Sequence, residues 1–187
     1  FNNADVNFSE VNELGQVIAN ALGRRSDQLI IDALAGTTSA SVGTSGTPLT
    51  IKTLLAAKRA LDAKGVPSTD RYFVIESKGI EDLLKTTEVT SSDYNTVKAL
   101  VGGDLNSFLG FKIIQLADRA EGGIASDGTN FKGFAYHKRA VGFGLNMDIS
   151  TKAEWVAHKQ SWLSVGNLKA GAALIDNDGV VPVIYSI

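Results

Sequence analysis

The residues of this chain that could do chemistry are few and lack the partners that such chemistry needs. Gly43–Thr47 has the glycine and hydroxyl content of a phosphate loop, but the lysine that a phosphate loop requires is missing. Asp176–Gly179 resembles the start of a calcium loop, yet Tyr185 occupies the place of the bidentate Glu. We therefore predict a plain flexible loop for the first segment and a tight turn for the second.

The two histidines, His137 and His158, do not support a catalytic hypothesis. A Ser-His-Asp arrangement needs a His close to a reactive Ser and an orienting acid, and Gly-x-Ser-x-Gly does not occur. His158 follows Trp155 in an alternating segment, which indicates a surface or inter-strand position. The chain has no cysteines, so disulfides and thiolate metal sites are excluded. We expect no catalytic, cofactor-binding or metal-binding residue, and no hydrolytic, transferase or metal-dependent activity.

Trp155 and Trp162 could serve as stacking platforms for nucleic-acid bases. In one continuous strand they would face opposite sides, but a turn between them could bring them together. Core packing or a subunit contact is favoured, because aromatic side chains are enriched in both. The basic pairs Arg24-Arg25 and Lys138-Arg139 are small, and the net charge is −2. A protein that mainly grips nucleic acid or an acidic membrane would show a basic excess.

The length and composition fit a folded protein with a substantial core. A chain of 187 residues with 44% apolar residues can form one large domain or two small lobes. No apolar run approaches the ~20 residues needed to span a bilayer, and no signal peptide is visible. The chain begins at Phe1 rather than at Met, so we expect it to be the C-terminal portion of a longer protein.

A long amphipathic helix is predicted over roughly Ser9–Ala35, with Asn7 as its cap and Glu10 as the capping-box partner. After a loop to Pro48, helices and strands alternate. The helices are predicted to begin after Thr50, at Ser77 and at Asp93, with a short helix or turn over His137–Val141; the strands are predicted at 71–75, 111–116 and 131–136.

From Leu145 onward the chain is predicted to be mostly extended. The turn at Asp176–Gly179 predicts a hairpin between 172–175 and 180–184. Pro182 indicates that the last strand lies on a sheet edge. Asp118–Asn130 is rich in glycine and poor in large apolar residues, so we predict a mobile domain tip there.

The order of these elements resembles that of the major capsid proteins of tailed bacteriophages, the Hong Kong 97-type fold shared with encapsulin shells. Each local similarity is weak alone, but their order and spacing cover nearly the whole chain. The similar segments are the spine-like helix Ser9–Ala35 with its Arg24–Leu34 part, Tyr72–Ile75, Asp104–Ile114, Phe134–Val141 and the closing stretch from Gly171 to Val181.

The resemblance implies an α+β capsid fold with a long spine helix, a central α/β axial domain and peripheral β-strands. Residues 1–48 and 145–187 would form the peripheral domain, and residues 49–144 the axial domain. The implied function is a structural capsid protein, not an enzyme, whose copies self-assemble into the icosahedral shell around the phage genome. Implied partners are copies of itself in capsomers, then scaffold, portal or decoration proteins, and packaged DNA through non-specific inner-surface contact, with no membrane.

Two alternatives remain open at this stage. The chain could be an encapsulin-like compartment shell protein, or an α/β enzyme with His137 or His158 beside a carboxylate in a deep pocket. The resemblance also implies assembly in the bacterial host cytoplasm and a place in the virion capsid. Because the family's N-terminal arm and extended loop would precede Phe1, we expect the chain alone to be monomeric or weakly associated.

Overall fold

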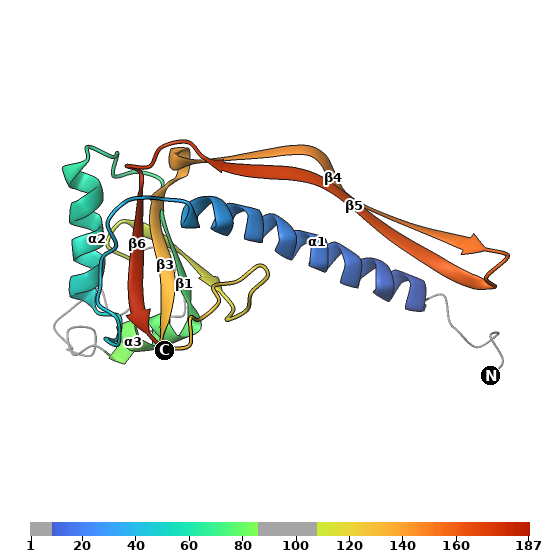
Figure 1. Ribbon diagram of the computed structural model, residues 1–187, viewed down its shortest axis with the longest axis horizontal. Helices are drawn as coiled ribbons and strands as arrows, with labels where there is room; N and C mark the ends of the chain where they lie inside the picture. The colour runs from blue at the N-terminus through green and yellow to red at the C-terminus, as the bar shows by residue number, and fades with distance from the viewer. Residues whose placement is uncertain (1–8, 86–107) are drawn as a thin grey trace.

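The molecule consists of an α/β body and a long arm that projects from it (Figure 1). The computed structural model describes residues 9–85 and 108–187, with the backbone alone for residues 9–12. The body contains a four-stranded sheet and its helices, whereas the arm is made of α1 (Ser9–Ala35), β4 (Val141–Val156) and β5 (Ser161–Leu174). This is the mixed helix and sheet architecture predicted from the sequence.

The sheet of the body has the strand order β2-β1-β3-β6. Its strands are β1 (Arg71–Glu76), β2 (Phe111–Leu116), β3 (Asn130–His137) and β6 (Val180–Ser186). β1 runs parallel to β2 and antiparallel to β3, and β6 is antiparallel to β3. β6 therefore lies at an edge of this sheet, as Pro182 indicated.

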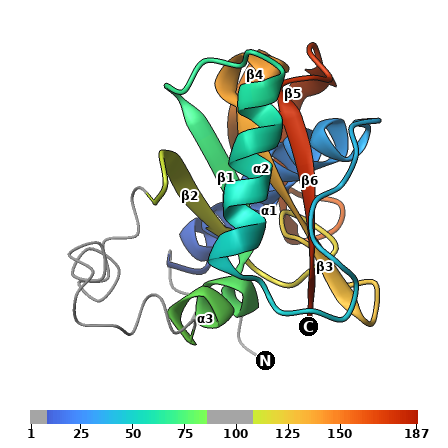
Figure 2. The same cartoon turned by 90° about the vertical axis from the view of Figure 1, so that its left-hand side faces the viewer.

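Two helices pack against one face of the sheet and bury the main hydrophobic core (Figure 2). α2 (Ile51–Ala63) begins after Thr50, whose side chain accepts a hydrogen bond from Thr53 N as a helix cap should. α3 is Ser77–Lys85. The core side chains from these helices and the inner face of the sheet are almost fully buried; they include Leu54, Leu61, Phe73, Phe111, Val183 and Tyr185.

A second, smaller core fixes one end of α1 to the opposite face of the sheet. Ile31 and Leu34 pack there with Phe134 and Val180, and all four are buried. The rest of α1 leaves the body and runs beside the β4–β5 ribbon (Figure 1). At 27 residues the helix is ~40 Å long, and its bounds, Ser9–Ala35, are those that the apolar periodicity predicted.

The expected C-terminal hairpin is not formed. β5 pairs along its length with β4, whereas β6 pairs with β3 in the other sheet. The turn after β5 docks on the corner where β3 ends, because Ile175 N and Asp176 N both donate to Ala140 O. A tight-turn sequence specifies a reversal of the chain, but the flanking strands pair with whichever neighbours bury their side chains.

The segment Asp118–Asn130 is not a free tip along its whole length. Ile124 is 3% exposed, and its N–H donates to Ala117 O. Gly122 N donates to Gln28 Oε1 of α1 at 3.0 Å. Burial raises the pKa of Asp27 on the same helix, and the nearby Arg119 charge partly offsets that rise. The middle of the segment is therefore anchored on α1, and residues 125–129 form its more open part.

Other predicted elements agree with the structure, and some lie outside the described residues. The strands at 71–75, 111–116 and 131–136 are present, as is a 3₁₀ turn, η1 (Lys138–Ala140). The cap at Asn7 and the helix from Asp93 to Val101 lie outside the described residues, as do residues 104–107 at the start of Asp104–Ile114. The division into peripheral and axial domains stays a prediction, and the pairing of β6 with β3 would move residues 180–186 to the axial side.

Candidate assembly surface

The structure gives His137 a structural position. Its Nδ1 accepts a hydrogen bond from Arg139 N at 3.2 Å, so the ring caps η1. The side chain lines a cavity of about 550 Å³ together with Asp70, Thr69 and Lys138. Asp70 Oδ1 lies 3.3 Å from Lys112 Nζ, so this carboxylate forms an ion pair with Lys112. His158 lies in the turn between β4 and β5, far from this cavity (Figure 1).

The two loop motifs contribute to packing. Val42 N donates to Pro182 O, and Ile184 N donates to Val42 O, so residues just before Gly43 cover the β6 edge. Asn177 Oδ1 accepts from Thr37 Oγ1 at 2.7 Å and from Thr38 N at 2.8 Å, which ties the turn at Asp176–Gly179 to the loop after α1. Within residues 9–85 and 108–187 no cluster of three or more His, Asp or Glu side chains could hold a metal ion.

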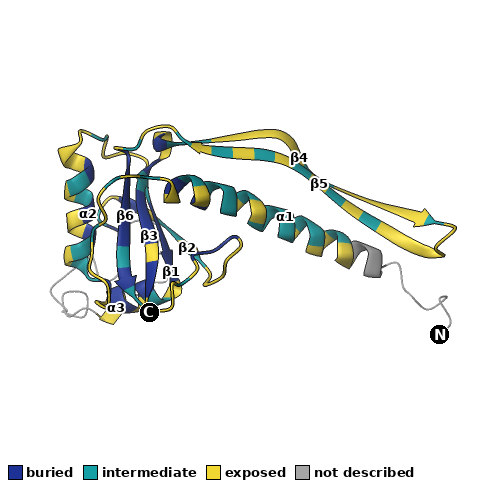
Figure 3. Cartoon of the chain, viewed as in Figure 1, coloured by how far each residue is buried: buried dark blue, intermediate teal, exposed yellow. Residues whose placement is uncertain are grey.

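Most of the large apolar side chains that are exposed lie on the arm. Much of the β4–β5 ribbon is coloured exposed in Figure 3. Of the described residues, nine large apolar side chains on α1 and the ribbon are exposed by 41% or more. They are Leu14, Val17, Phe143, Leu145, Met147, Trp155, Trp162, Leu163 and Val165. The side chains on the ribbon lie on both of its faces, and large apolar groups left exposed in this number are typical of an interaction site.

The outer edges of the ribbon also have backbone groups that could pair with another strand. In the part of the chain that the structure describes, β4 and β5 pair only with each other, which leaves an open edge on each strand. A two-stranded ribbon is marginal in water unless a helix or further strands pack on it. Here α1 covers one face. The edges are of the kind that pairs with another strand.

Small side chains set how closely α1 and the ribbon approach. Gly166 lies directly against the helix, since a Cβ there would be 2.2 Å from Ile18 Cγ2 and 3.0 Å from Leu22 Cδ1. Towards the tip of the ribbon this packing opens. A Cβ at Gly15 would meet nothing nearer than Thr151 Oγ1, at 4.0 Å.

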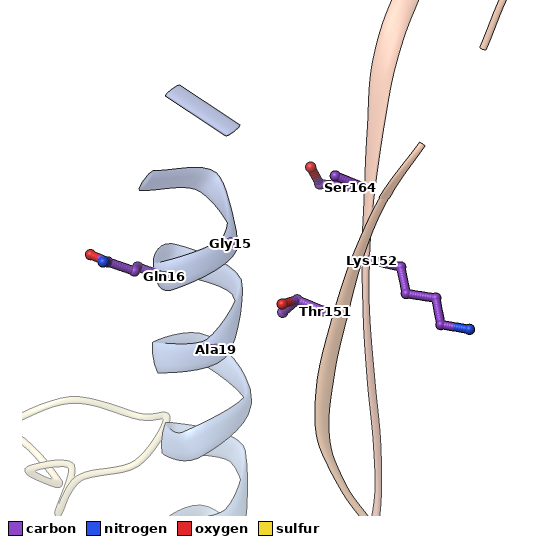
Figure 4. A pocket seen from close by; sticks show the side chains of 7 residues that line it. Gly15, Gln16, Ala19, Thr151, Lys152 and Ser164 are labelled. Atoms are coloured by element: carbon purple, nitrogen blue, oxygen red, sulfur yellow. The ribbon is translucent and has the colours of Figure 1, made fainter. Parts of the chain in front are cut away.

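The opening is a groove of about 560 Å³ between helix and ribbon (Figure 4). Its walls are mostly small residues: Gly15 and Ala19 on α1, and Thr151, Ala153 and Ser164 on the ribbon. Figure 4 shows Thr151 and Ser164 directed towards the helix, whereas Gln16 and Lys152 point away from the gap. The described walls of the groove therefore consist of backbone and short side chains on both sides.

Trp155 and Trp162 lie side by side near the end of the ribbon. They are direct cross-strand partners, with ring centroids 5.6 Å apart in an edge-to-face arrangement. The turn at residues 157–160 brings them together, as the sequence allowed. Neither is core: Trp155 is 45% and Trp162 52% exposed.

Ion pairs belong to the body. The six that the described residues form join body residues or the turn after β5, and the most buried is Arg71 Nη2 with Asp62 Oδ1 at 2.6 Å. The arm thus presents apolar groups and backbone edges, with no organised set of catalytic or ligand-binding groups among the described residues. None of the described helices is long and apolar enough to cross a membrane.

Comparison with solved structures identifies this architecture. A chain from Mycobacterium phage Che8 superposes with a TM-score of 0.70 at 20% identity, over 88% of this chain and 60% of that chain. A chain from the capsid of the cyanophage P-SCSP1u has a TM-score of 0.65 at 19% identity, over 98% and 67%. A chain of the SrpI encapsulin complex from Synechococcus elongatus PCC 7942 has a TM-score of 0.64 at 10% identity, over 96% and 67%. The chain thus spans 60% of the Che8 chain's length.

The body, the spine-like helix and the projecting ribbon have the fold of these solved capsid and shell chains. A family model described as "Phage capsid protein" matches residues 1–186. The chain belongs to this phage capsid family. No curated protein sequence matches it. The fold predicted from the sequence and the structural, non-enzymatic role are confirmed by these matches, which leaves the α/β enzyme without support.

The sequence analysis did not identify the groove or the open ribbon edges. The only signal was the alternation along β5, where Ser164, Gly166 and Ala170 are half-buried between exposed neighbours. Because Ser164, Gly166 and Ala170 are small, the alternation does not stand out as a buried face.

Proposed function

We propose that the chain is the shell-forming part of a major capsid protein, many copies of which close into the icosahedral head around a phage genome. The family match over residues 1–186 carries this proposal. In it the arm makes contacts between subunits, and the body points to the capsomer axis. Repeated weak contacts suffice for a closed shell because each further contact acts within an assembly that is already tethered.

The proposed domain division follows from this role. Residues 1–48 with most of 145–187 form the peripheral part at the capsomer edge, and residues 49–144 form the axial part. We assign the C-terminal strand to the other part, because β6 pairs with β3 in the sheet of the body. Residues 180–186 are then axial.

The proposed partners beyond other copies are scaffold, portal and decoration proteins, and packaged DNA. A net charge of −2 suits a wall that confines DNA through non-specific contact without gripping it. Assembly would take place in the cytoplasm of the bacterial host, before the shell becomes part of the virion.

Electron microscopy with sedimentation of the protein expressed alone tests the proposal. Closed particles of uniform size, containing this chain as the main protein, are expected from the full-length protein. Full-length protein that stays a small soluble species at every concentration would contradict the proposal.

An encapsulin-like shell is the second candidate, supported by the likeness to the SrpI encapsulin chain. The particle contents separate the two. Nuclease-protected DNA in particles from infected or induced cells supports the phage head, whereas a single enclosed protein cargo and no DNA supports the compartment.

A further inference from the structure

A basic corner lies where β3 leaves the sheet of the body and the arm begins (Figure 1). It consists of His137 at the end of β3 and Lys138 and Arg139 in η1. These three residues line the cavity of about 550 Å³ together with Thr69 and Asp70. Lys138 N donates to Asp70 O at 3.0 Å, which ties η1 to the start of β1. The cavity wall is therefore built on fixed backbone, as a binding site requires.

His137 brings a buried donor without an acceptor to this cavity. The residue is only 7% exposed. Its Nδ1 accepts the hydrogen bond from Arg139 N, so the proton of the neutral ring is on Nε2. Among residues 9–85 and 108–187, no group accepts a hydrogen bond from Nε2. Buried donors that the protein does not satisfy are usually bonded to water or to a bound ion.

A second unsatisfied donor lies at the same end of the sheet. Arg71 is the direct cross-strand partner of His137, so the two side chains lie on the same face of the sheet. The guanidinium bonds to Asp62 and to two backbone carbonyls. Its Nη1 is buried and has no hydrogen-bond partner in the part of the chain that the structure describes. This end of the sheet thus has more donors than acceptors.

The charge of the cavity wall is positive, although the chain as a whole has a net charge of −2. Lys138 and Arg139 are exposed, and neither forms an ion pair with another described residue. Asp70 is the one carboxylate among the described wall residues, and Lys112 already pairs with it at 3.3 Å. A surplus of cations and donors favours an anion, because an anion brings acceptors alone.

A phosphate group fits this set of donors better than a carboxylate. A free phosphate carries up to about two negative charges at neutral pH, and successive phosphates of a DNA strand supply one each. A carboxylate has a single charge and two oxygens in one plane. The wall offers the Thr69 hydroxyl, His137 Nε2 and two cationic side chains. A volume of about 550 Å³ also leaves room for the group that carries the phosphate.

We propose that the basic corner, with Thr69, binds a phosphate group, either free phosphate or a phosphate of the DNA backbone. Lys138 and Arg139 neutralise its charge, and His137 Nε2 and Thr69 Oγ1 donate hydrogen bonds to its oxygens. The DNA source rests on the proposed function, in which the shell encloses a genome, whereas the free-phosphate source does not. With DNA as the source, the basic corner faces the interior of the shell.

Nuclear magnetic resonance of the isotope-labelled chain tests the site with two probes, inorganic phosphate and a short DNA duplex. Either probe should shift the amide signals of Thr69, His137, Lys138 and Arg139 in a saturable way, whereas sodium chloride at the same ionic strength should not. Shifts with inorganic phosphate alone assign free phosphate, and shifts with the duplex assign the DNA backbone. No shift at the basic corner with either probe overturns the proposal. A stronger effect of polyglutamate than of both probes also overturns it, in favour of an acidic protein partner.

Variants separate the site from general charge. Lys138→Gln with Arg139→Gln should weaken binding of the active probe at least ~10-fold, and both residues are exposed, so the fold should be kept. His137→Asn keeps an acceptor for Arg139 N but removes the Nε2 donor, and should weaken binding about 3-fold or more. The matched control, Lys52→Gln with Arg59→Gln, removes the same charge from exposed positions of α2 that do not line this cavity, and should change affinity less than ~2-fold. Equal losses in the two double variants would overturn the specific site.

Failure of this site and failure of the proposed function give different results. A chain that assembles into shells but shows no shift at the basic corner with either probe loses the phosphate site and keeps the capsid role. A chain that binds phosphate at the basic corner but never forms shells keeps the site and loses the capsid role.

Discussion

At the scale of single residues, close backbone approaches fix how the loops lie on the body. Gly43 has φ +94°, and a Cβ there would be 2.1 Å from Ile184 O. This approach lets Val42 bond to the β6 edge on both sides, at Pro182 O and Ile184 N. The edge is thus covered, which protects it from pairing with other chains. The Gly-Ser-Thr segment is a specific edge cover and not a plain flexible loop.

Replacing Gly43 by Ala should destabilise the protein by about 3 kcal/mol, because the strained φ and the contact with the Ile184 carbonyl act together. Gly46→Ala is the matched control. Gly46 also has a positive φ, +76°, but a Cβ there meets nothing within 4 Å, so a loss of about 1 kcal/mol is expected. Urea unfolding of both variants measures the difference. Equal losses would show that the approach to Ile184 is not decisive.

Tyr136 predicts a dependence of stability on alkaline pH. Its ring stacks on Tyr72 with centroids 5.7 Å apart. Burial, with a smaller contribution from Tyr72, raises the pKa of Tyr136 to about 12. The folded state therefore holds the phenol proton more tightly than the unfolded chain, in which the pKa is about 10. The resulting stabilisation is fully present below about pH 10 and is lost as the pH rises towards about 12.

Tyr136→Phe has no phenol at this position, so its free energy of unfolding should fall less between about pH 9.5 and about pH 11.5 than that of the parent chain. Some fall remains because burial also raises the pKa of Tyr185. Urea titrations at each pH provide the measurement. Parallel pH profiles for the two proteins would contradict the role of Tyr136.

At the scale of elements, the arm depends on a close fit between a helix and a two-stranded ribbon. The body holds α1 along its C-terminal part, where Ile31 and Leu34 enter the second core and Gln28 Oε1 accepts a hydrogen bond from Gly122 N. Along the ribbon it relies on contacts such as that of Ile18 and Leu22 with Gly166. The arm should therefore be the less stable part of the molecule, since fewer buried contacts oppose its opening.

Gly166→Ala tests this fit. The added methyl would collide with Ile18 and Leu22, so the helix and the ribbon must separate or repack, at a cost of about 1–3 kcal/mol. Gly171→Ala on the same strand meets nothing within 4 Å and should be neutral or slightly stabilising. Hydrogen exchange of the β4 and β5 amides, compared between the two variants, locates the loss. Faster exchange in Gly166→Ala confined to the body would contradict the dependence of the arm on this packing.

The sequence predicted the elements whose signals are local. α1 has capped apolar periodicity, β2 is a short apolar run between glycines and a turn, and both have the predicted bounds. Pairing was harder to predict, because β5 and β6 flank a strong turn yet join different sheets. The groove was not predictable, since it results from residues on α1 and on a ribbon more than 100 positions away that happen to be small.

At the scale of the whole molecule, the body and the arm have different chemistry. The body buries most of its apolar groups and forms the ion pairs, whereas the arm leaves large apolar side chains and strand edges exposed. A subunit of a shell needs a rigid body and an edge that binds neighbouring subunits. We expect the chain alone to be monomeric at low micromolar concentration, because weak contacts hold only when many act together. Large uniform oligomers at that concentration would contradict this expectation.

The central claim is that this chain builds a shell through its arm. Cryo-electron microscopy of particles that contain the chain tests it most directly. The account predicts that α1 and the β4–β5 ribbon of each subunit lie against neighbouring subunits, with the four-stranded sheet of the body nearer the capsomer axis. A map in which the arm faces solvent on both sides, with the subunits joined through the body alone, would contradict it.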